Sequence, residues 1–269
     1  MEPLASAVDL IRGRTHAPQD RPGHRRRHFR SPISSTRIDR IAGSTMKGVA
    51  KKSGSPDDAN PGGVRSAAPF VPTTTSVRAL KAAAHGCRGC DLYKTATQVV
   101  FGAGSRTARV MFVGEQPGDQ EDRHGEPFVG PAGAVLLKAL DDAGIPRDTA
   151  YLTNAVKHFK WEPRGKRRIH KKPRASEIKA CRPWLEAELR AIKPAMVVCL
   201  GATAAQAVLG SQFKLMQQRG QVVASPLAAR VVATIHPSSV LRAPDSEGRR
   251  AAYDLLVNDL KVVAKEVRR

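Results

Sequence analysis

Four cysteines are the first residues with an obvious chemistry in this 269-residue sequence. Cys87 and Cys90 are separated by two residues, and a tight turn at that spacing places two thiolates on one metal ion or cluster. Two more ligands would complete such a site, and the candidates are Cys181, His158 and Cys199. Cys199 lies in an apolar stretch, where a buried structural thiol is the commoner state. Spacing alone leaves both a four-ligand site and a set of structural thiols open.

A second chemical feature is the basic segment 164–172, in which six of nine residues are Lys or Arg and one is His170. The neighbouring cations disfavour the imidazolium form, so we expect His170 to be neutral at about pH 7. A neutral imidazole is available as a nucleophile or as a base. The same segment is equally typical of a solvated basic loop that binds phosphates around an incidental histidine.

The elements that must position these residues alternate between strands and helices. Short apolar runs predict strands over 108–114, 150–156, 195–201 and 231–235. Helical spacing predicts helices over 131–143, 175–192, 202–209 and 247–267. This alternation indicates an α/β fold with a mainly parallel sheet that is covered on both faces.

Polar residues follow three of the predicted strands. Glu115 and Gln116 follow the first, Asn154 lies near the end of the second with His158 just beyond, and His236 follows the last. Ligands of parallel α/β sheets bind outside the carboxyl ends of the strands, so this edge is the predicted site. The turn 114–118 could hold an anion or a carbonyl on its backbone N–H groups, or it could be an ordinary strand-to-loop turn.

Composition limits the class of protein. The chain is 41% hydrophobic but only 4% aromatic, and no apolar run approaches the roughly 18–20 residues that cross a bilayer. The first residues do not resemble a secretory signal, so we expect a soluble protein in the cytoplasm, associated with the nucleoid. The net charge is +21; residues 1–70 contribute +7 and residues 71–269 contribute +14. The predicted domain is itself basic, which favours a polyanionic partner, although a generally basic proteome is an alternative.

The chain divides at about residue 70. Residues 1–69 are rich in Arg, Pro, Gly and Ser and carry no hydrophobic period, so we predict a disordered basic extension there. Residues 70–269 form the predicted folded domain. The extension could be an auxiliary DNA-binding arm, or its first 45 residues could precede the true start at Met46.

Several motifs, in order along the chain, resemble those of family 4 uracil-DNA glycosylases. Within that superfamily the sequence is most similar to the UdgX branch, because of Gln116, His158 and the insertion 166–170. The resemblance extends from about Phe70 to the C-terminus. The matching motifs are Gly114-Glu115-Gln116-Pro117-Gly118-Asp119, Pro127-Phe128-Val129-Gly130-Pro131-Ala132-Gly133, Thr153-Asn154-Ala155-Val156-Lys157 and His236-Pro237-Ser238-Ser239.

The resemblance implies a three-layer α/β/α sandwich, the uracil-DNA glycosylase fold, and a [4Fe–4S] cluster. Cys87, Cys90 and Cys181 match cluster ligands of the family. The remaining ligand position falls on His158, which we favour over Cys199; mixed Cys and His ligation occurs in iron–sulfur proteins.

The resemblance also implies roles for the residues at the strand ends. Phe128 would stack on a uracil that is flipped out or presented on a single strand, and the Asn154 amide would bind its polar edge. Backbone amides around Gln116 would hold a carbonyl. His236 would stabilise negative charge on the departing base, which contributes on the order of 3 kcal/mol in sites of this type.

In the UdgX branch a loop histidine attacks the sugar at C1′, and this role falls on His170, with Glu115 to orient it or accept its proton. The result would be a covalent adduct with DNA. Lys166, Arg167, Arg168 and Lys171 would hold phosphates. We expect a monomer that prefers single-stranded uracil-containing DNA and needs no protein partner. The alternatives are a turnover glycosylase that releases abasic DNA, and a non-catalytic, metal-stabilised DNA-binding protein.

Overall fold

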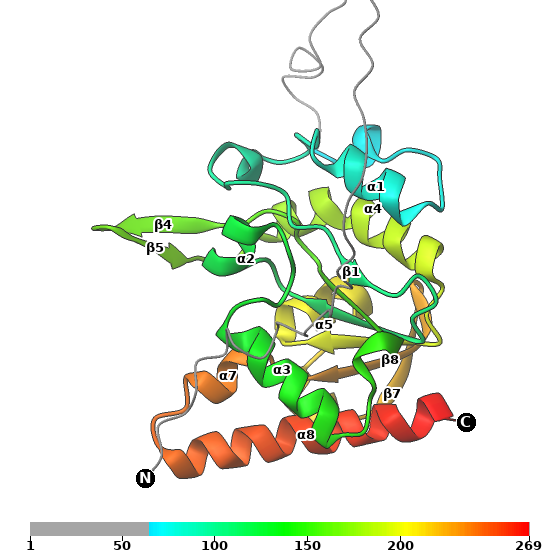
Figure 1. The fold of residues 1–269 in the computed structure, drawn as a ribbon, viewed down its shortest axis with the longest axis vertical. Helices are drawn as coiled ribbons and strands as arrows, with labels where there is room; N and C mark the ends of the chain where they lie inside the picture. The colour runs from blue at the N-terminus through cyan, green and yellow to red at the C-terminus, as the bar shows by residue number, and fades with distance from the viewer. Residues whose placement is uncertain (1–64, 269) are drawn as a thin grey trace, which may run out of the picture. The chain divides into compact units, whose positions relative to one another are not determined.

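The structure, a computed structural model, describes residues 65–268 (Figure 1). Most of the extension predicted over residues 1–69 therefore lies outside the described residues. Its last part does not match the prediction, because Ala67 is buried and its amide N donates to the carbonyl O of Ala180 at 2.7 Å. The folded domain thus begins a few residues before Phe70.

The centre of the domain is a six-stranded sheet with the strand order β1-β3-β2-β6-β8-β7. β2, β3, β6 and β8 run parallel, and the two edge strands β1 and β7 are antiparallel to their neighbours. The strands are β1 (Ala103–Gly104), β2 (Val110–Gly114), β3 (Ala150–Asn154), β6 (Met196–Leu200), β7 (Val222–Ser225) and β8 (Ala228–Thr234). β2, β3 and β6 are buried at every position, as central strands of a covered parallel sheet should be.

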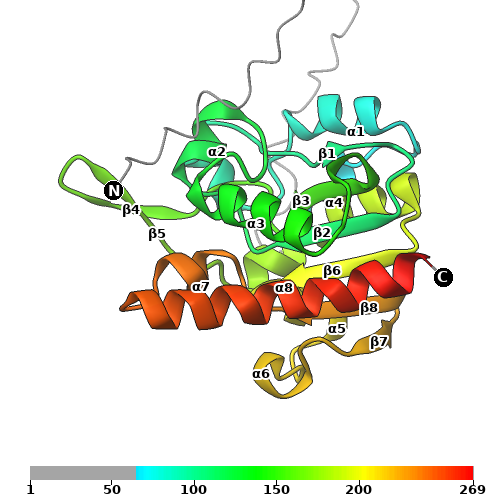
Figure 2. The same ribbon diagram turned by 60° about the horizontal axis from the view of Figure 1, so that its bottom comes forward.

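Helices cover both faces of the sheet, which makes the three-layer α/β/α sandwich. In Figure 2, the C-terminal helix α8 runs along one face beside α3. The helices are α1 (Val77–Ala84), α2 (Asp119–His124), α3 (Pro131–Asp142), α4 (Ala175–Ile192), α5 (Ala202–Leu209), α6 (Leu215–Gln218), α7 (Ser238–Leu241) and α8 (Ser246–Arg268), with the 3-10 turns η3 (Ala68–Phe70), η4 (Asp91–Lys94) and η5 (Arg147–Thr149). None of the described helices has the length and apolar character that spanning a membrane requires.

Alternate residues of each central strand face opposite cores. Phe112 of β2 packs in the core under α3 and α8, whereas its neighbours Met111 and Val113 pack in the core under α4 and α5. A third apolar cluster joins α1 to α4 and contains three of the cysteines. The sandwich predicted from sequence is confirmed.

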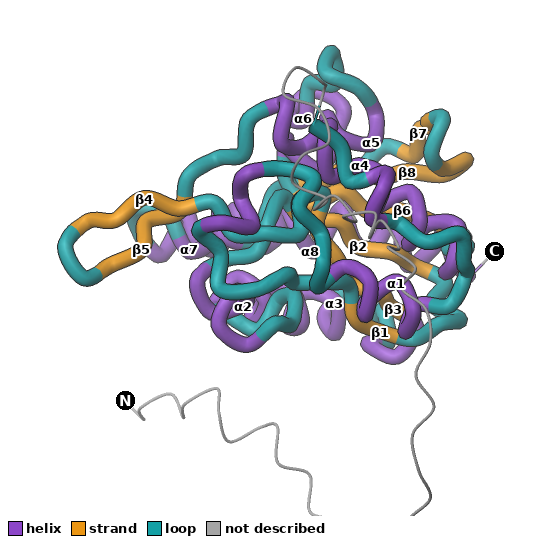
Figure 3. The backbone as a smooth tube through the Cα atoms, turned by 90° about the horizontal axis from the view of Figure 1, so that it is seen from above, coloured by secondary structure: helices purple, strands orange, loops and turns teal. Residues whose placement is uncertain are grey.

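A two-stranded hairpin, β4 (Trp161–Arg164) and β5 (Arg167–His170), lies outside the sheet and projects from the body (Figures 1 and 3). Its strands pair Trp161 with His170 and Arg164 with Arg167, which leaves a two-residue turn. Gly165 in that turn has φ 58°, a left-handed conformation that glycine adopts without steric cost. The basic segment expected to be a loop is therefore an ordered hairpin.

Candidate functional site

A cavity of about 730 Å³ opens at the carboxyl edge of the parallel strands, where the sequence predicts the site. β2 ends at Gly114, β3 ends at Asn154 and β8 ends just before His236, so three strands of the parallel sheet place their following residues at the same edge. The volume falls within the range of about 300–1,000 Å³ that is usual for small-ligand sites. Six of the predicted residues line the cavity: Glu115, Gln116, Phe128, Asn154, His170 and His236.

Two glycines leave room for the side chain of Asn154 and for Phe128 in the cavity wall. A Cβ on Gly114 would lie 2.3 Å from Oδ1 of Asn154 and 2.8 Å from Cζ of Phe128, so both side chains cross directly over this glycine. A Cβ on Gly133 would lie 1.8 Å from the carbonyl O of Phe128. Glycine at these two positions is therefore a steric requirement of the cavity wall.

Phe128 itself has φ 59°, a left-handed backbone conformation that is unusual for an aromatic residue. Glu121 of α2 lines the cavity and holds two glycines of the chain: Gly118 N donates to its Oε2 at 3.0 Å and Gly130 N donates to its Oε1 at 2.8 Å. Sequence reasoning missed Glu121, although an acidic residue between two glycine turns is a usable signal.

A hydrogen bond fixes which ring nitrogen of His236 carries the proton. The backbone N–H of Ser238 donates to Nδ1 of His236 at 3.2 Å, so Nδ1 is an acceptor and the ring proton resides on Nε2. Burial lowers the pKa of His236 to about 4, and the nearby Arg242 and His170 act in the same direction. The ring is stacked with Phe128 at a centroid distance of 6.5 Å. His236 thus presents a neutral N–H donor.

His170 and Glu115 form a pair at the mouth of the cavity. Nε2 of His170 lies 3.5 Å from Oε1 of Glu115, and the two side chains are 48% and 22% exposed. Burial lowers the pKa of His170; Glu115 opposes this effect and Arg242 adds to it. The imidazole is therefore neutral at neutral pH, as the sequence predicts, but the principal cause is burial rather than the charge of the surrounding segment.

The side chain of Gln116 is hydrogen-bonded to the base of the hairpin. Its side-chain Nε2 donates to the carbonyl oxygens of Lys160 at 3.1 Å and Lys171 at 3.0 Å, and its Oε1 accepts from Lys160 N at 3.3 Å. These two lysines mark the base of the hairpin. The carboxamide therefore joins the turn after β2 to the hairpin that carries His170, and only the backbone of Gln116 is left for a ligand.

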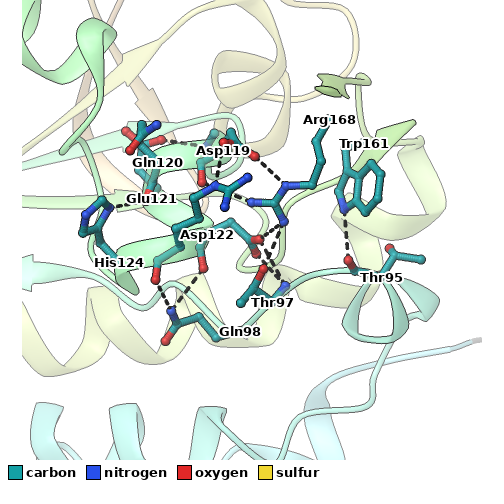
Figure 4. A network of polar contacts seen from close by, with 12 residues as sticks. Thr95, Thr97, Gln98, Asp119, Gln120, Glu121, Asp122, His124, Trp161 and Arg168 are labelled. Atoms are coloured by element: carbon teal, nitrogen blue, oxygen red, sulfur yellow. Dashed lines mark hydrogen bonds and ion pairs between the residues drawn. The ribbon is translucent and has the colours of Figure 1, made fainter. Parts of the chain in front are cut away.

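Arg168 also departs from the expected phosphate-binding role. Its guanidinium Nε lies 2.5 Å from Asp119 Oδ1, and its Nη1 lies 2.6 Å from Asp122 Oδ2 and 3.0 Å from Thr97 Oγ1 (Figure 4). The side chain is only 14% exposed, so its charge is neutralised inside the protein. Arg168 ties the hairpin to α2.

Two aromatic rings complete this attachment. The guanidinium of Arg168 lies 5.5 Å from the centroid of Trp161 and 5.4 Å from that of Phe159. The indole N–H of Trp161 in turn donates to the carbonyl O of Thr95 at 2.9 Å (Figure 4). Cation–π contacts of this kind add about 0.5–2 kcal/mol each when partly desolvated.

The other basic residues of the hairpin and the cavity differ in exposure and in ion pairing. Lys166 and Arg167 are exposed at the tip and make no ion pair within the described chain. Lys171 is paired with Glu162 at 2.8 Å, but both side chains are about half exposed, so this pair is weak. Lys172 and Arg242 line the cavity.

Three cysteines lie in one buried apolar cluster between α1 and α4. Cys87, Cys90 and Cys181 are each less than 8% exposed. Trp184 Nε1 donates to Sγ of Cys87 at 3.2 Å, and Lys157 N donates to Sγ of Cys181 at 3.3 Å. N–H groups directed at sulfur are typical of cluster-bound thiolates.

The cysteines therefore fit an iron–sulfur cluster in donor type, burial and hydrogen bonding. His158, the proposed fourth ligand, directly follows Lys157 and is 6% exposed. Within residues 65–268, however, no three His, Cys, Asp or Glu side chains converge closely enough to form a closed metal site. Cys199 belongs to a different core, in β6 opposite Val113 of β2.

The fold and the cavity define an α/β enzyme domain with two histidines, two carboxylates, two carboxamides and an aromatic ring at the carboxyl edge of its sheet. The profile of the uracil DNA glycosylase superfamily matches residues 101–261. The chain belongs to this superfamily.

Individual relatives agree with the family assignment. The chain is 35% identical over 181 residues to a type-4 uracil-DNA glycosylase of Thermotoga maritima, covering 67% of this chain and 91% of the relative. It is 38% identical over 165 residues to the type-4 enzyme of Archaeoglobus fulgidus, covering 59% and 79%. A type-5 enzyme of Pyrobaculum aerophilum is 36% identical over 153 residues, covering 50% and 63%. Within the superfamily, the chain is family 4-like.

Proposed function

We propose that this protein excises uracil from DNA and that His170 then captures the sugar, leaving the protein covalently attached. The observation that carries the proposal is the Glu115–His170 pair at 3.5 Å in the same cavity as His236 and Asn154. Family membership and the type-4 relatives support uracil excision. The ordered hairpin that brings His170 to the cavity supports capture.

Base recognition in this proposal uses the cavity wall. Uracil enters the cavity from a single strand, or flipped from a duplex, and stacks on Phe128. The Asn154 carboxamide bonds its polar edge, and the methyl group of thymine or the reversed donor–acceptor pattern of cytosine fits poorly. The exposed Lys166 and Arg167 at the hairpin tip, with Lys172 at the cavity, bind phosphates. We expect a monomer to suffice, acting on single-stranded DNA at the nucleoid.

Bond cleavage relies on His236. The N1–C1′ bond breaks and its electron pair leaves with uracil, while the Nε2–H of His236 donates to the oxygen on which negative charge develops. A neutral imidazole with its proton on Nε2 is the form that this step requires, and the Ser238 N–H bond to Nδ1 favours that form.

Capture follows at the sugar. The unprotonated ring nitrogen of His170 donates its electron pair to the electron-deficient C1′, which forms an N–C1′ bond, and the imidazolium loses its remaining N–H proton to Glu115 or solvent. The deprotonated adduct is a neutral N-substituted imidazole, and expelling it would regenerate the oxocarbenium-like sugar, so the adduct should persist.

We further propose that Cys87, Cys90, Cys181 and His158 hold a [4Fe–4S] cluster. The cluster would fix the chain after α1 and the chain after β3 to helix α4, a structural contribution. It takes no part in the bond changes described above.

One experiment separates the proposed activities. Purified protein is mixed with a labelled single-stranded oligonucleotide containing one uracil and analysed on a denaturing gel. A shifted band that resists heat and detergent, and is lost with a thymine control or in His170→Ala, is the expected result. Alkali-sensitive strands without a shifted band would mean a turnover glycosylase. Neither product, from protein that binds DNA and contains iron, would mean a non-catalytic binder.

A further inference from the structure

A completely buried ion pair lies next to the end of β3 and is used by none of the steps above. Nζ of Lys157 lies 2.5 Å from Oε2 of Glu188, and both side chains are 0% exposed. Lys157 follows β3, and Glu188 lies on α4, two turns after Cys181. The pair therefore joins the helix that carries a proposed cluster ligand to the strand that carries Asn154.

Every polar atom of the pair has a partner. The ammonium of Lys157 donates to Glu188, to Thr153 Oγ1 at 2.6 Å and to the carbonyl O of Asn154 at 2.7 Å, which uses its three protons. Glu188 Oε1 also accepts from Gly102 N at 3.0 Å and from the Tyr151 hydroxyl at 3.1 Å. The network is thus closed and has one favoured arrangement.

Stability alone does not account for such a network. Apolar side chains of similar volume often stabilise a core as well as a buried ion pair does, or better, because of the cost of removing two charges from water. A closed polar network, by contrast, specifies a single geometry. The geometry that it fixes here is that of the peptide that follows Asn154.

Asn154 is the point where the sheet ends. It is the last residue of β3, opposite Gly114 of β2, and its side chain must cross Gly114 beside Phe128. The next two residues still bond to the turn after β2, through Ala155 N to Gly114 O and Val156 N to Glu115 O. The carbonyl of Asn154 itself is held by Lys157, so a shift of the ammonium would rotate this peptide and move the carboxamide.

We propose that Lys157 and Glu188 are a positioning pair that fixes the Asn154 carboxamide for uracil recognition. This inference rests on the proposed function, because it assigns to Asn154 the reading of the base. Neither residue touches the substrate. The pair acts by holding one backbone carbonyl, and its loss should reduce preference for uracil more than affinity for DNA in general.

The test measures binding preference, which does not require turnover. The quantity is the ratio of the Kd for an oligonucleotide with thymidine to the Kd for one with a non-hydrolysable 2′-fluoro-deoxyuridine. Lys157→Met/Glu188→Gln should lower this ratio about tenfold or more, since a displacement of the order of 1 Å at a positioned group has effects of up to about 100-fold. Arg230→Met/Glu266→Gln, which removes an ion pair between β8 and α8 outside the cavity, should leave the ratio unchanged.

A double-mutant cycle distinguishes positioning from general loosening. If the pair acts through Asn154, adding Lys157→Met/Glu188→Gln to Asn154→Ala causes no further loss of preference. An unchanged ratio in the pair variant, or a loss that adds in full to that of Asn154→Ala, would overturn the inference. If the pair variant does not fold, Thr153→Val removes one hydroxyl of the network without altering charge and should lower the ratio about two- to threefold. A wild-type protein with no preference for uracil would instead refute the proposed function.

Discussion

The guanidinium of Arg168 contacts the carboxylate of Asp122, with Nη1 2.6 Å from Oδ2, and the Asp122 side chain is completely buried. This contact joins the hairpin to α2, and the hairpin delivers His170 to the cavity. We therefore expect Arg168→Ala to reduce covalent capture about tenfold while uracil release continues. The buried Asp122 carboxylate would lose its cation and keep only the hydrogen bonds from Thr97 N, which should lower the free energy of unfolding by roughly 3 kcal/mol.

The measurement is the ratio of adduct to released uracil after a single turnover. Arg167→Ala is the matched control, because it removes the neighbouring arginine, which is exposed and makes no ion pair in the described chain. It should weaken DNA binding and its salt dependence without changing that ratio. Equal ratios in the two variants would show that the anchor of the hairpin is dispensable.

The pH dependence of capture should follow His170. Because only the neutral imidazole attacks, and because burial lowers its pKa below the ordinary value of 6.5, adduct formation should be complete at neutral pH and fall only below pH 6.5. Removing the cation in Arg242→Gln should raise the pKa and move the midpoint to higher pH. Removing the anion in Glu115→Gln should lower the pKa and move it to lower pH. Rates of adduct formation from pH 4 to 8 would test both signs; shifts in the same direction would refute the assignment.

Uracil release should require His236 whether or not the sugar is captured afterwards. Replacing it in His236→Ala removes the donor to the departing base, and losses of about 10²–10³-fold are usual for such groups. Adduct formation should fall in parallel, because the bond must break before the sugar is captured. His124→Ala is a suitable control, since His124 is exposed and bonds only its own helix. Normal uracil release in His236→Ala would contradict the role of His236 in bond cleavage, and adduct formation without uracil release would contradict the order of steps.

Recognition of uracil should require the absence of a side chain at Gly114. Its replacement by Ala would put a Cβ 2.3 Å from the Asn154 side chain, so we expect Gly114→Ala to remain folded but to lose uracil preference. Gly86→Ala provides the comparison, because its new Cβ would come no closer than 3.6 Å to any neighbour. Binding of uracil-containing and thymine-containing DNA by both variants is the test, and wild-type preference in Gly114→Ala would exclude the proposed position of Asn154.

Iron content should distinguish the cysteines. Cys181→Ser should lose iron and visible absorbance, whereas Cys199→Ala should retain both, because Cys199 packs in β6 in a separate core. The cavity left by Cys199→Ala should cost only about 1 kcal/mol of stability. Iron per protein, measured on anaerobically purified variants, is the readout; loss of iron in Cys199→Ala would reverse the choice between His158 and Cys199.

The sequence predicts the sandwich well and the hairpin poorly, for physical reasons. The expected helices 175–192 and 202–209 match α4 and α5 at both ends, because an apolar stripe and local stop signals define them. The hairpin has no alternation of apolar and polar residues, and its order depends on contacts of Arg168 with residues 46 and 49 positions earlier. Such long-range contacts leave no local pattern.

The candidate site was likewise predictable from the sequence only in part. The sequence predicts that Glu115, Asn154 and His236 meet, because each follows a strand and the topology of a parallel sheet brings these strand ends to one edge. The partners of Gln116 and Arg168 were not predictable, because a polar side chain near a site can face a ligand or a neighbouring element. Lys157 and Glu188 did leave a signal, each being a charged residue in an otherwise apolar stretch or helix face.

The left-handed backbone of Phe128 has a thermodynamic consequence. A non-glycine residue in this conformation costs about 1–3 kcal/mol, and the surrounding glycines and Glu121 hold it there in the free protein. That cost is met during folding, so the ring needs no rearrangement when a base arrives. Binding of the base should therefore cost little conformational entropy at Phe128. The heat capacity change of binding should reflect burial of the base rather than ordering of the protein.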